Sequence, residues 1–397
     1  MAQQLAARLA KDGHQVTMVV PFPNRPDGVL FPGFRRRLRS RTVAPEGYSV
    51  VRCANWLLGK RRRHIYRLLE NITFGLSSAW AAWREGRPDV LILETWPMFA
   101  TQMSALLADW WQIPYLYYVQ DVYPEAAESL GILNPDGKVA RLCRSWDRRL
   151  CSRSSATLVI SKTMQNLLVR HRQLSSEHFV VIPNWIDGST LKLLSGQSTW
   201  RREQGIPENA FVALFGGTLG EVSGVEVLIE VAQILHEEKD VLIVCVGEGT
   251  RKKSLEEAAL RLRLKNFRLL PFQPQERVYE VQNAADVALL TIQPRYSNAS
   301  VPSKLISYFA AARPVICAAA TDSAVAQSVF EADAGVVVTP GDARAIAAGI
   351  VQIMRAPEAA VRMGANARRY FEEHYTLERA YSQFTHLLQR VVPADLG

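Results

Sequence analysis

Three short segments of the chain carry residues whose types and spacing could bind an anion or orient a hydroxyl group. In SVPSKL (residues 300–305), Pro302 is placed to open a helix, which brings Ser303 and Lys304 into its first turn. A lysine is otherwise unfavourable at the positive end of a helix dipole. Lys304 therefore indicates an anionic ligand such as a diphosphate, and the alternative is an ordinary exposed lysine.

Glycines supply the second candidate. FGGTLG (residues 215–220) follows an apolar strand expected at 211–215 and precedes a helix expected near 225–236. Glycines allow a tight turn and close backbone approach to an oxygen-rich ligand, and the next helix offers unpaired N–H groups to an anion. VGEG (residues 246–249) follows another strand and faces the same edge. Neither is a complete phosphate-binding motif, so plain strand-to-helix turns are the alternative.

The third candidate is QDVYPE (residues 120–125), at the end of a strand expected at 115–119. A carboxylate at a strand end, here Asp121, can orient a hydroxyl or accept its proton. The alternative is an aspartate that caps a helix ahead of Pro124. Asn184, farther along the chain, could shape a cleft or merely follow a strand end.

The elements that must position these residues alternate between short apolar strands and amphipathic helices. Such alternation predicts an α/β fold of two doubly wound, Rossmann-like domains with parallel sheets, facing a central cleft. We expect domains at 1–187 and 188–375, and a helix in 376–397 (about 377–391) that crosses back to the first domain. Ligands of such folds lie at the carboxyl ends of the strands. The chain opens on a helix at 2–11, so the first strand of the N-terminal domain and its glycine turn are expected to be missing.

The composition of the chain excludes several classes of protein. The 397 residues are 48% hydrophobic and 21% charged, which excludes a disordered chain, and no apolar run is long enough to span a bilayer. Five scattered cysteines without C-x-x-C argue against disulfides and structural zinc. With no D-x-D motif and no paired histidines, we expect no metal, and with no apolar signal core we expect a cytoplasmic protein.

The net charge of +9 is concentrated in one stretch. From Arg35 to Arg67 there are 11 basic residues and one acid, Glu46, with apolar and aromatic residues beside them. That mixture favours an anionic membrane surface, or else a solvated face with a buried helix. No nucleic-acid motif accompanies the charge, so no nucleic acid is expected.

Taken together, these segments resemble the GT-B glycosyltransferases of family 4. More narrowly, they are similar to the branch that builds bacterial capsule, colanic-acid and O-antigen sugars, including N-acetylfucosamine transferases. The resemblance runs nearly the whole length and is carried by GHQVT (13–17), VQDVYPE (119–125), IPNWID (182–187), GTLG (217–220), GVE (224–226), PFQP (271–274), VPSKL (301–305) and AAARPVI (310–316).

The resemblance implies a nucleotide-sugar donor in the C-terminal domain and a polyprenyl-diphosphate-linked saccharide acceptor, at the inner membrane face, in the N-terminal one. The implied donor-binding residues are Gly217, Thr218, Gly220, Gly247, Phe272, Gln273, Ser303, Lys304 and Leu305. The implied acceptor-binding residues are Gln120, Asp121, Glu125 and Asn184. The family's diphosphate-gripping Arg and Lys fall at Thr218 and about Ser223, and its glutamate pair falls near Ala299 and Ser307, which leaves Lys304 as the main diphosphate ligand.

We therefore expect a retaining glycosyltransferase that moves a sugar from a UDP-sugar to an acceptor hydroxyl, with no cofactor. Lys304 and Asp121 are the expected catalytic residues: Lys304 stabilises the departing diphosphate and Asp121 orients the acceptor. Two alternatives remain. One is a UDP-sugar 2-epimerase on the same fold, and the other is a non-catalytic relative that binds a membrane or a partner. We expect the protein at the inner face of the cell membrane, peripherally attached.

Overall fold

The computed structural model describes residues 1–24, 29–35, 37–55, 64–129, 131–188, 199–296 and 303–392. The chain divides into two compact units, the first made of Met1–Pro183 with Tyr381–Gly397 and the second of Asn184–Ala380. These divisions fall a few residues from the predicted limits at 187 and 375. The last segment is held in the first unit by the Tyr381 hydroxyl, which donates to Asp12 at 2.6 Å.

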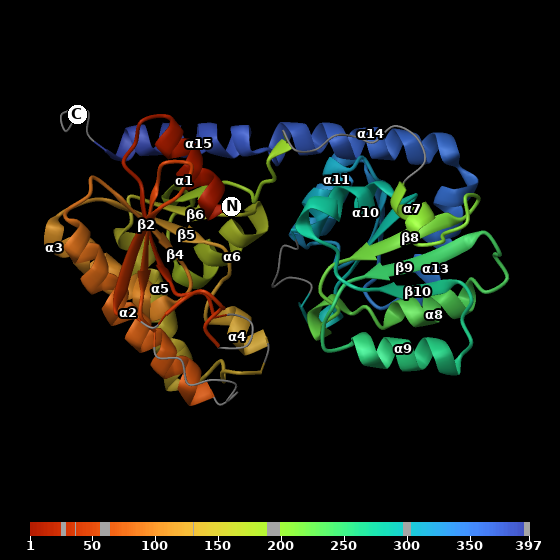
Figure 1. Cartoon of the computed structure of the whole chain (residues 1–397), viewed down its shortest axis with the longest axis horizontal. Helices are drawn as coiled ribbons and strands as arrows, with labels where there is room; N and C mark the ends of the chain where they lie inside the picture. The colour runs from red at the N-terminus through yellow and green to blue at the C-terminus, as the bar shows by residue number, and fades with distance from the viewer. Residues whose placement is uncertain are drawn as a thin grey trace. The chain divides into compact units, whose positions relative to one another are not determined.

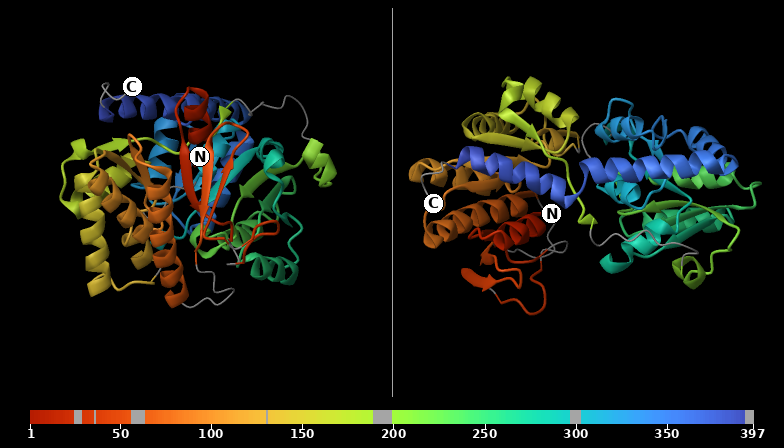
Figure 2. Two further views of the ribbon diagram at one scale, coloured as in Figure 1. Left: turned by 60° about the vertical axis from the view of Figure 1, so that its left-hand side comes forward. Right: turned by 90° about the horizontal axis from the view of Figure 1, so that it is seen from above.

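The first unit contains two sheets. Four parallel strands lie in the order β4 (Leu91–Glu94), β5 (Tyr115–Val119), β6 (Ala156–Val159) and β7 (Phe179–Val181). A separate sheet has the order β1 (Thr17–Pro21), β3 (Ser49–Cys53), β2 (Arg39–Val43), and only β2 runs antiparallel to its neighbour. Within the described ranges β1 and β4 each pair on one side only, so the doubly wound sheet predicted for this unit is in two pieces (Figure 2).

The helices of the first unit follow the order of the chain. They are α1 (Ala2–Lys11), α2 (His64–Glu85), α3 (Met98–Trp111), α4 (Glu125–Ser129), α5 (Lys138–Arg153) and α6 (Lys162–Arg172). The last helix, α15 (Leu377–Val391), begins in the second unit and belongs to the first from Tyr381 onward. The bounds of α1, β5 and α15 confirm the prediction residue for residue. β5 was recognisable because all five of its side chains are buried, as in a central parallel strand covered on both faces.

The second unit is built on one six-stranded parallel sheet in the order β10-β9-β8-β11-β12-β13 (Figure 1). Its strands are β8 (Phe211–Gly216), β9 (Val241–Val246), β10 (Phe267–Leu270), β11 (Val287–Thr291), β12 (Val315–Ala318) and β13 (Gly335–Val338). Its helices are α7 (Thr199–Glu203), α8 (Val227–Ile234), α9 (Lys252–Arg261), α10 (Val278–Asn283), α11 (Lys304–Ala310), α12 (Ala324–Ala332), α13 (Ala343–Arg355) and α14 (Pro357–His374).

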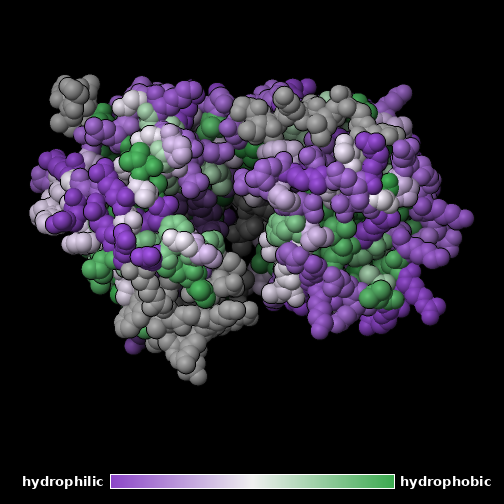
Figure 3. All heavy atoms as spheres, in the orientation of Figure 1, coloured by the Kyte–Doolittle hydropathy of each residue, from purple (hydrophilic) through white to green (hydrophobic). Residues whose placement is uncertain are grey.

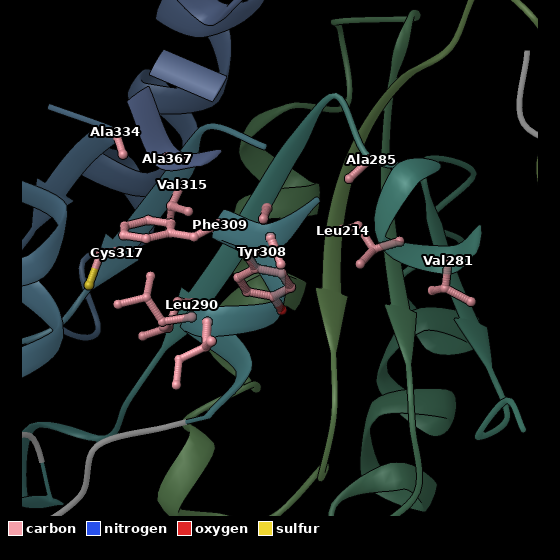
Figure 4. Packing of buried hydrophobic residues seen from close by; sticks show 14 of the residues in the cluster. Leu214, Val281, Ala285, Leu290, Tyr308, Phe309, Val315, Cys317, Ala334 and Ala367 are labelled. Atoms are coloured by element: carbon pink, nitrogen blue, oxygen red, sulfur yellow. The ribbon is translucent and has the colours of Figure 1, made fainter. Parts of the chain in front are cut away.

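Two hydrophobic clusters cover the two faces of this sheet. Along β8, Val212 and Leu214 belong to one cluster, whereas Ala213 and Phe215 belong to the other, as the two-residue period of a strand requires. The first cluster is completed by α7, α10, α11, α12 and α14 (Figure 4), and the second by α8, α9 and α13. The sheet is therefore buried on both faces. A ligand would have to bind at the ends of its strands.

Part of the basic stretch of residues 35–67 forms β2 and β3, two strands that were not predicted from the sequence. Arg39 and Arg41, on β2, both pair with Glu85 of α2. Arg52, on β3, donates to Thr42 at 2.8 Å. These three arginines are engaged within the protein. Residues 36 and 56–63 lie outside the described ranges, so the membrane role of the stretch stays a prediction.

Candidate functional site

The turn after β8 is held against the turn after β9 by backbone hydrogen bonds. The Gly217 N–H donates to the Val246 carbonyl at 2.9 Å, and the Leu219 N–H donates to the Glu248 carbonyl at 2.9 Å. The pairing of the two strands thus continues beyond the sheet into the turns. The turn begins in an unusual backbone conformation, since Gly217 has φ +133°. A residue with a side chain would be strained there.

Gly247 and Gly249 are required because these two turns touch. A Cβ on Gly247 would lie 1.9 Å from the Gly217 carbonyl oxygen, and one on Gly249 would lie 2.2 Å from that of Leu219. Both contacts are impossible without moving the backbone. The structure therefore gives Gly247 a packing reason to be glycine, and its predicted contact with a donor stays a prediction.

Lys304 lies against the same turn from the other side. Its ammonium nitrogen is 3.9 Å from the centre of the Phe215 ring, and a Cβ built on Gly217 would be 3.6 Å from it. Among the residues that the structure describes, none forms an ion pair or hydrogen bond with this ammonium group. A lysine amine, a buried aromatic ring and a glycine turn thus meet at the carboxyl end of β8.

Burial determines the electrostatics of Lys304. Loss of water lowers the pKa of its ammonium group from 10.5 to about 8, and the nearby Cys245 thiol only partly opposes this. A partly buried cation without a counter-charge is unfavourable unless an anion joins it. The position therefore fits an anionic ligand, as the sequence indicated.

Tyr308, one helical turn after Lys304, fixes where α11 meets the sheet. Its hydroxyl accepts from the Gly216 N–H at 3.0 Å and donates to the Leu289 carbonyl at 3.2 Å. The ring is fully buried in the core under α11 (Figure 4). Tyr308 thus joins the starts of the glycine turn and of the lysine helix. Tyr308 was not predicted as a site residue, because its only signal in the sequence is the four-residue spacing from Lys304.

The loop after β11 braces the far end of the glycine turn. The Thr291 hydroxyl donates to the Ser223 carbonyl at 2.6 Å, and the Gln293 N–H donates to the Val222 carbonyl at 3.0 Å. Ser223, where the family's lysine was expected, donates its hydroxyl to the Gly220 carbonyl at 2.6 Å. These bonds give the turn a fixed shape and leave Thr218 exposed.

The remaining predicted donor residues are dispersed. Phe272 is exposed, and Gln273 accepts from the Trp200 indole at 3.4 Å; both follow β10, two strands away from β8. Leu305 is buried in the core. Ser303 is exposed at the start of α11, a helix of only seven residues, and Pro302 lies outside the described ranges.

In the first unit, Gln120 and Asp121 directly follow β5. The Gln120 N–H donates to the Thr95 hydroxyl at 3.2 Å, which ties this corner to the end of β4. The Asp121 side chain is exposed, yet nearby protein displaces part of its water and raises the pKa of its carboxyl above the usual 3.8. Beside it, the rings of Trp96 and Tyr123 are stacked with centres 4.9 Å apart.

Glu125 is committed to a buried ion-pair network. Its two carboxylate oxygens accept from Arg172 at 2.6 and 2.8 Å, and the same guanidinium donates to Asp147 at 2.6 Å. Burial alone would raise the pKa of Glu125, but the hydrogen bonds from Arg172 outweigh it and bring the pKa to about 2. This arrangement favours a structural role over the predicted acceptor role, which stays a prediction.

Asn184, the remaining predicted acceptor residue, is buried and is the first residue of the second unit. It therefore does not share a unit with Asp121.

The described part of the chain contains no cluster of three or more histidine, cysteine or acidic side chains that could hold a metal ion. All five cysteines are free thiols.

Two units with parallel sheets, one with an uncompensated lysine beside a glycine turn at its carboxyl edge, are typical of enzymes that use nucleotide-linked substrates. Comparison with known families defines the class as a GT-B glycosyltransferase. A model described as glycosyl transferase 4-like domain matches residues 1–185, and one described as glycosyl transferases group 1 matches residues 196–370. The chain is thus a glycosyltransferase whose two parts match these two domain models.

Relatives agree with this class, and solved structures share the fold. The chain is 26% identical over 384 residues to WcaI of Escherichia coli K12, a provisionally assigned colanic acid biosynthesis glycosyl transferase, across 95% of this chain and 92% of WcaI. Sucrose-phosphate synthase from Thermosynechococcus elongatus has a TM-score of 0.78 at 17% identity, over 98% of this chain and 92% of its own. Anabaena HepE, solved in complex with UDP, has a TM-score of 0.67 at 18% identity, over 81% and 84%.

Proposed function

We propose that this glycosyltransferase moves a sugar from a UDP-sugar to a hydroxyl of a polyprenyl-diphosphate-linked acceptor in surface polysaccharide synthesis. The single observation that carries the proposal is the Lys304 ammonium, which is partly buried against the glycine turn and has no counter-charge among the described residues. A nucleoside diphosphate would supply that counter-charge. The similarity to WcaI supports the polysaccharide pathway, and UDP in the HepE complex supports the nucleotide.

Catalysis of this reaction depends mainly on stabilising the charge that develops in the transition state. As the bond between the sugar and the diphosphate breaks, negative charge builds on the leaving UDP. A positioned cation and backbone N–H donors in a site with little water stabilise such charge most effectively. Lys304 supplies the cation, and the turn of Gly217 and Thr218 supplies close backbone approach. We assign little to the dipole of α11, because the helix has only seven residues.

The other parts of the proposal come from the sequence. Asp121 is proposed to orient the acceptor hydroxyl and to take up its proton. Transfer is proposed to retain the configuration of the sugar. No cofactor is included beyond the UDP-sugar, since the chain lacks a D-x-D motif that would bridge a metal to the diphosphate.

Attachment to the inner face of the membrane is part of the same proposal, because the acceptor carries a lipid. None of the helices in the described part of the chain combines the length and apolar character needed to cross a bilayer. Contact with lipid is therefore proposed at the protein surface.

A panel of UDP-sugars with lipid-linked acceptors tests the proposal, with released UDP and the glycosylated lipid as readouts. We expect acceptor-dependent UDP release for one donor, and its loss in Lys304→Met. Lys252→Met is the matched control, because Lys252 lies at the same edge of the sheet but pairs with Glu248 at 2.7 Å. Conversion of a UDP-sugar to its epimer without an acceptor would favour the epimerase, and no turnover of any donor would favour a non-catalytic relative.

A further inference from the structure

We propose that the outward faces of α2 and α3, together with α5, form a docking surface for an anionic lipid bilayer. The inference deepens the membrane-linked acceptor proposed above and rests on it for its role in the cell. Its defining side chains follow the basic stretch of residues 35–67 in the chain, and α2 overlaps that stretch only at residues 64–67. We call the surface the tryptophan face and define it by Leu76, Trp80, Trp83, Leu106 and Trp110.

α2 is apolar on two opposite sides. Phe74 and Ala81 are buried against the first unit, 6% and 0% exposed. Leu76, Trp80 and Trp83 are 56%, 45% and 50% exposed. At 3.6 residues per turn these three lie within an arc of about 60°, roughly opposite the buried pair. A surface helix ordinarily has one apolar stripe facing the core and a polar face outward. The second stripe of α2 is exposed among the residues that the structure describes.

α3 extends this stripe, because the two helices touch. A Cβ on Gly75 of α2 would lie 2.4 Å from the Phe99 ring and 3.1 Å from the Ala100 nitrogen of α3. Leu106 and Trp110, four residues apart on one side of α3, are 47% and 67% exposed. On the face viewed in Figure 3, apolar patches are scattered among the polar surface. Large exposed apolar side chains on neighbouring helices, such as these, mark an interaction site.

The side chains on this face suit a bilayer interface. Tryptophan prefers the headgroup level of a membrane, where its ring is in an apolar layer and its N–H is near water. Three of the five residues of the tryptophan face are tryptophans. The Arg84 guanidinium lies 5.9 Å from the centre of the Trp80 ring, where it could contact lipid phosphate while the ring inserts.

α5 supplies a positive border. It exposes five basic side chains, while its one acid, Asp147, is buried. The five are Lys138, Arg141, Arg148, Arg149 and Arg153. The helix is joined to α3 by Arg153, which pairs with Asp109 at 2.9 Å. Basic residues close to an anionic leaflet each add attraction to it.

The charge also argues against a second copy of the chain as the occupant. A twofold dimer places the same patch on both partners. The arginines that border the tryptophan face would then meet one another, and like charges repel. An anionic bilayer is complementary to both the apolar centre and the positive border.

The test is cosedimentation of the full-length protein with two kinds of vesicle, phosphatidylcholine alone and phosphatidylcholine mixed with phosphatidylglycerol. We expect binding to the mixed vesicles, weaker at high salt, and little binding to phosphatidylcholine. The variant with Trp83→Ser and Trp110→Ser should bind at least about tenfold more weakly, as expected for a loss of ~1.4 kcal/mol of apolar insertion. Leu260→Ser is the control, because Leu260 is 78% exposed on α9 in the second unit.

Two results would overturn the proposal. One is binding by the double variant as tight as that of the unchanged protein, which would assign lipid contact to another part of the chain. The other is a drop from dimer to monomer in sedimentation velocity on making the variant, which would assign the face to self-association. Circular dichroism and thermal unfolding of the same samples show whether the variant is folded. UDP binding tests the proposed function separately, since the tryptophan face and Lys304 are in different units.

Discussion

Replacing Lys304 by methionine should make the protein without ligand more stable while removing its affinity for a nucleoside diphosphate. Methionine keeps the length and apolar character of the lysine stem beside Phe215 but carries no charge. Because the pKa of Lys304 falls from 10.5 to about 8, keeping its ammonium charged in the folded protein costs about 3 kcal/mol. Some of that is offset by attraction to the Phe215 ring, worth roughly 0.5–2 kcal/mol. We therefore expect Lys304→Met to gain about 1–3 kcal/mol in the free energy of unfolding at pH 7.

The pH dependence identifies the cause. The folded protein releases the Lys304 proton near pH 8, earlier than the unfolded chain does at 10.5. The penalty is therefore complete below pH 8, shrinks as the pH rises from 8 to 10.5, and is absent above. Stability of the unchanged protein should rise across that window relative to the variant, whatever other groups contribute to both.

Denaturant unfolding of both proteins at pH 7 and pH 10 measures these differences, with UDP titration on the same preparations. Lys252→Met, which removes a lysine paired with Glu248, should bring no gain in stability. A Lys304→Met protein that is less stable than the parent by the same amount at both pH values would refute the reasoning, because the ammonium would then be compensated within the fold.

Three further changes test the supports of the site and of the first unit. Gly247→Ala should lower the free energy of unfolding by about 1–3 kcal/mol and weaken UDP binding, because its Cβ would overlap a backbone oxygen. Gly220→Ala, whose Cβ would make only a 3.5 Å contact, should be tolerated, and thermal unfolding and UDP titration distinguish the two variants. Tyr308→Phe should lower the free energy of unfolding by about 1–3 kcal/mol and weaken donor binding, because it leaves the Gly216 N–H without its acceptor. An unchanged donor affinity would show that Tyr308 does not help to position Lys304. Glu125→Gln should lower the free energy of unfolding by about 3 kcal/mol at pH 7. This loss should shrink as the pH falls from 4.5 towards 2, because the Glu125 carboxylate stabilises the fold only while it is charged. Equal stability of the variant and the parent throughout a series of acid unfolding measurements would contradict this.

The strands of the second unit were predictable because the sheet is buried on both faces. β9 reads as six consecutive apolar residues between polar turns, and the structure gives the strand these same bounds, Val241–Val246. β2 was missed for the opposite reason. Its sequence RSRTV is basic and largely exposed, and it is a strand only because β3 pairs with it across a short turn.

The candidate site was predictable only in part. Lys304 and the glycine turn were recognised from local signals, namely a helix start and a strand-to-helix turn. The role of Glu125 depends on Arg172, 47 residues away, and no local pattern gives such a partner. Gly247 was expected to approach a ligand, but the nearest atom to its missing Cβ belongs to Gly217.

Titration of UDP by calorimetry into the unchanged protein and into Lys304→Met, at pH 7 and at pH 9, tests the central claim most directly. The ammonium group is charged below pH 8 and partly neutral above it in the free protein. A bound diphosphate would raise the pKa of Lys304, so that the amine takes up the missing proton on binding. We predict that the unchanged protein binds UDP more weakly at pH 9 with proton uptake, and that Lys304→Met binds weakly at both values. Equal affinity of the two proteins for UDP at pH 7 would contradict the account.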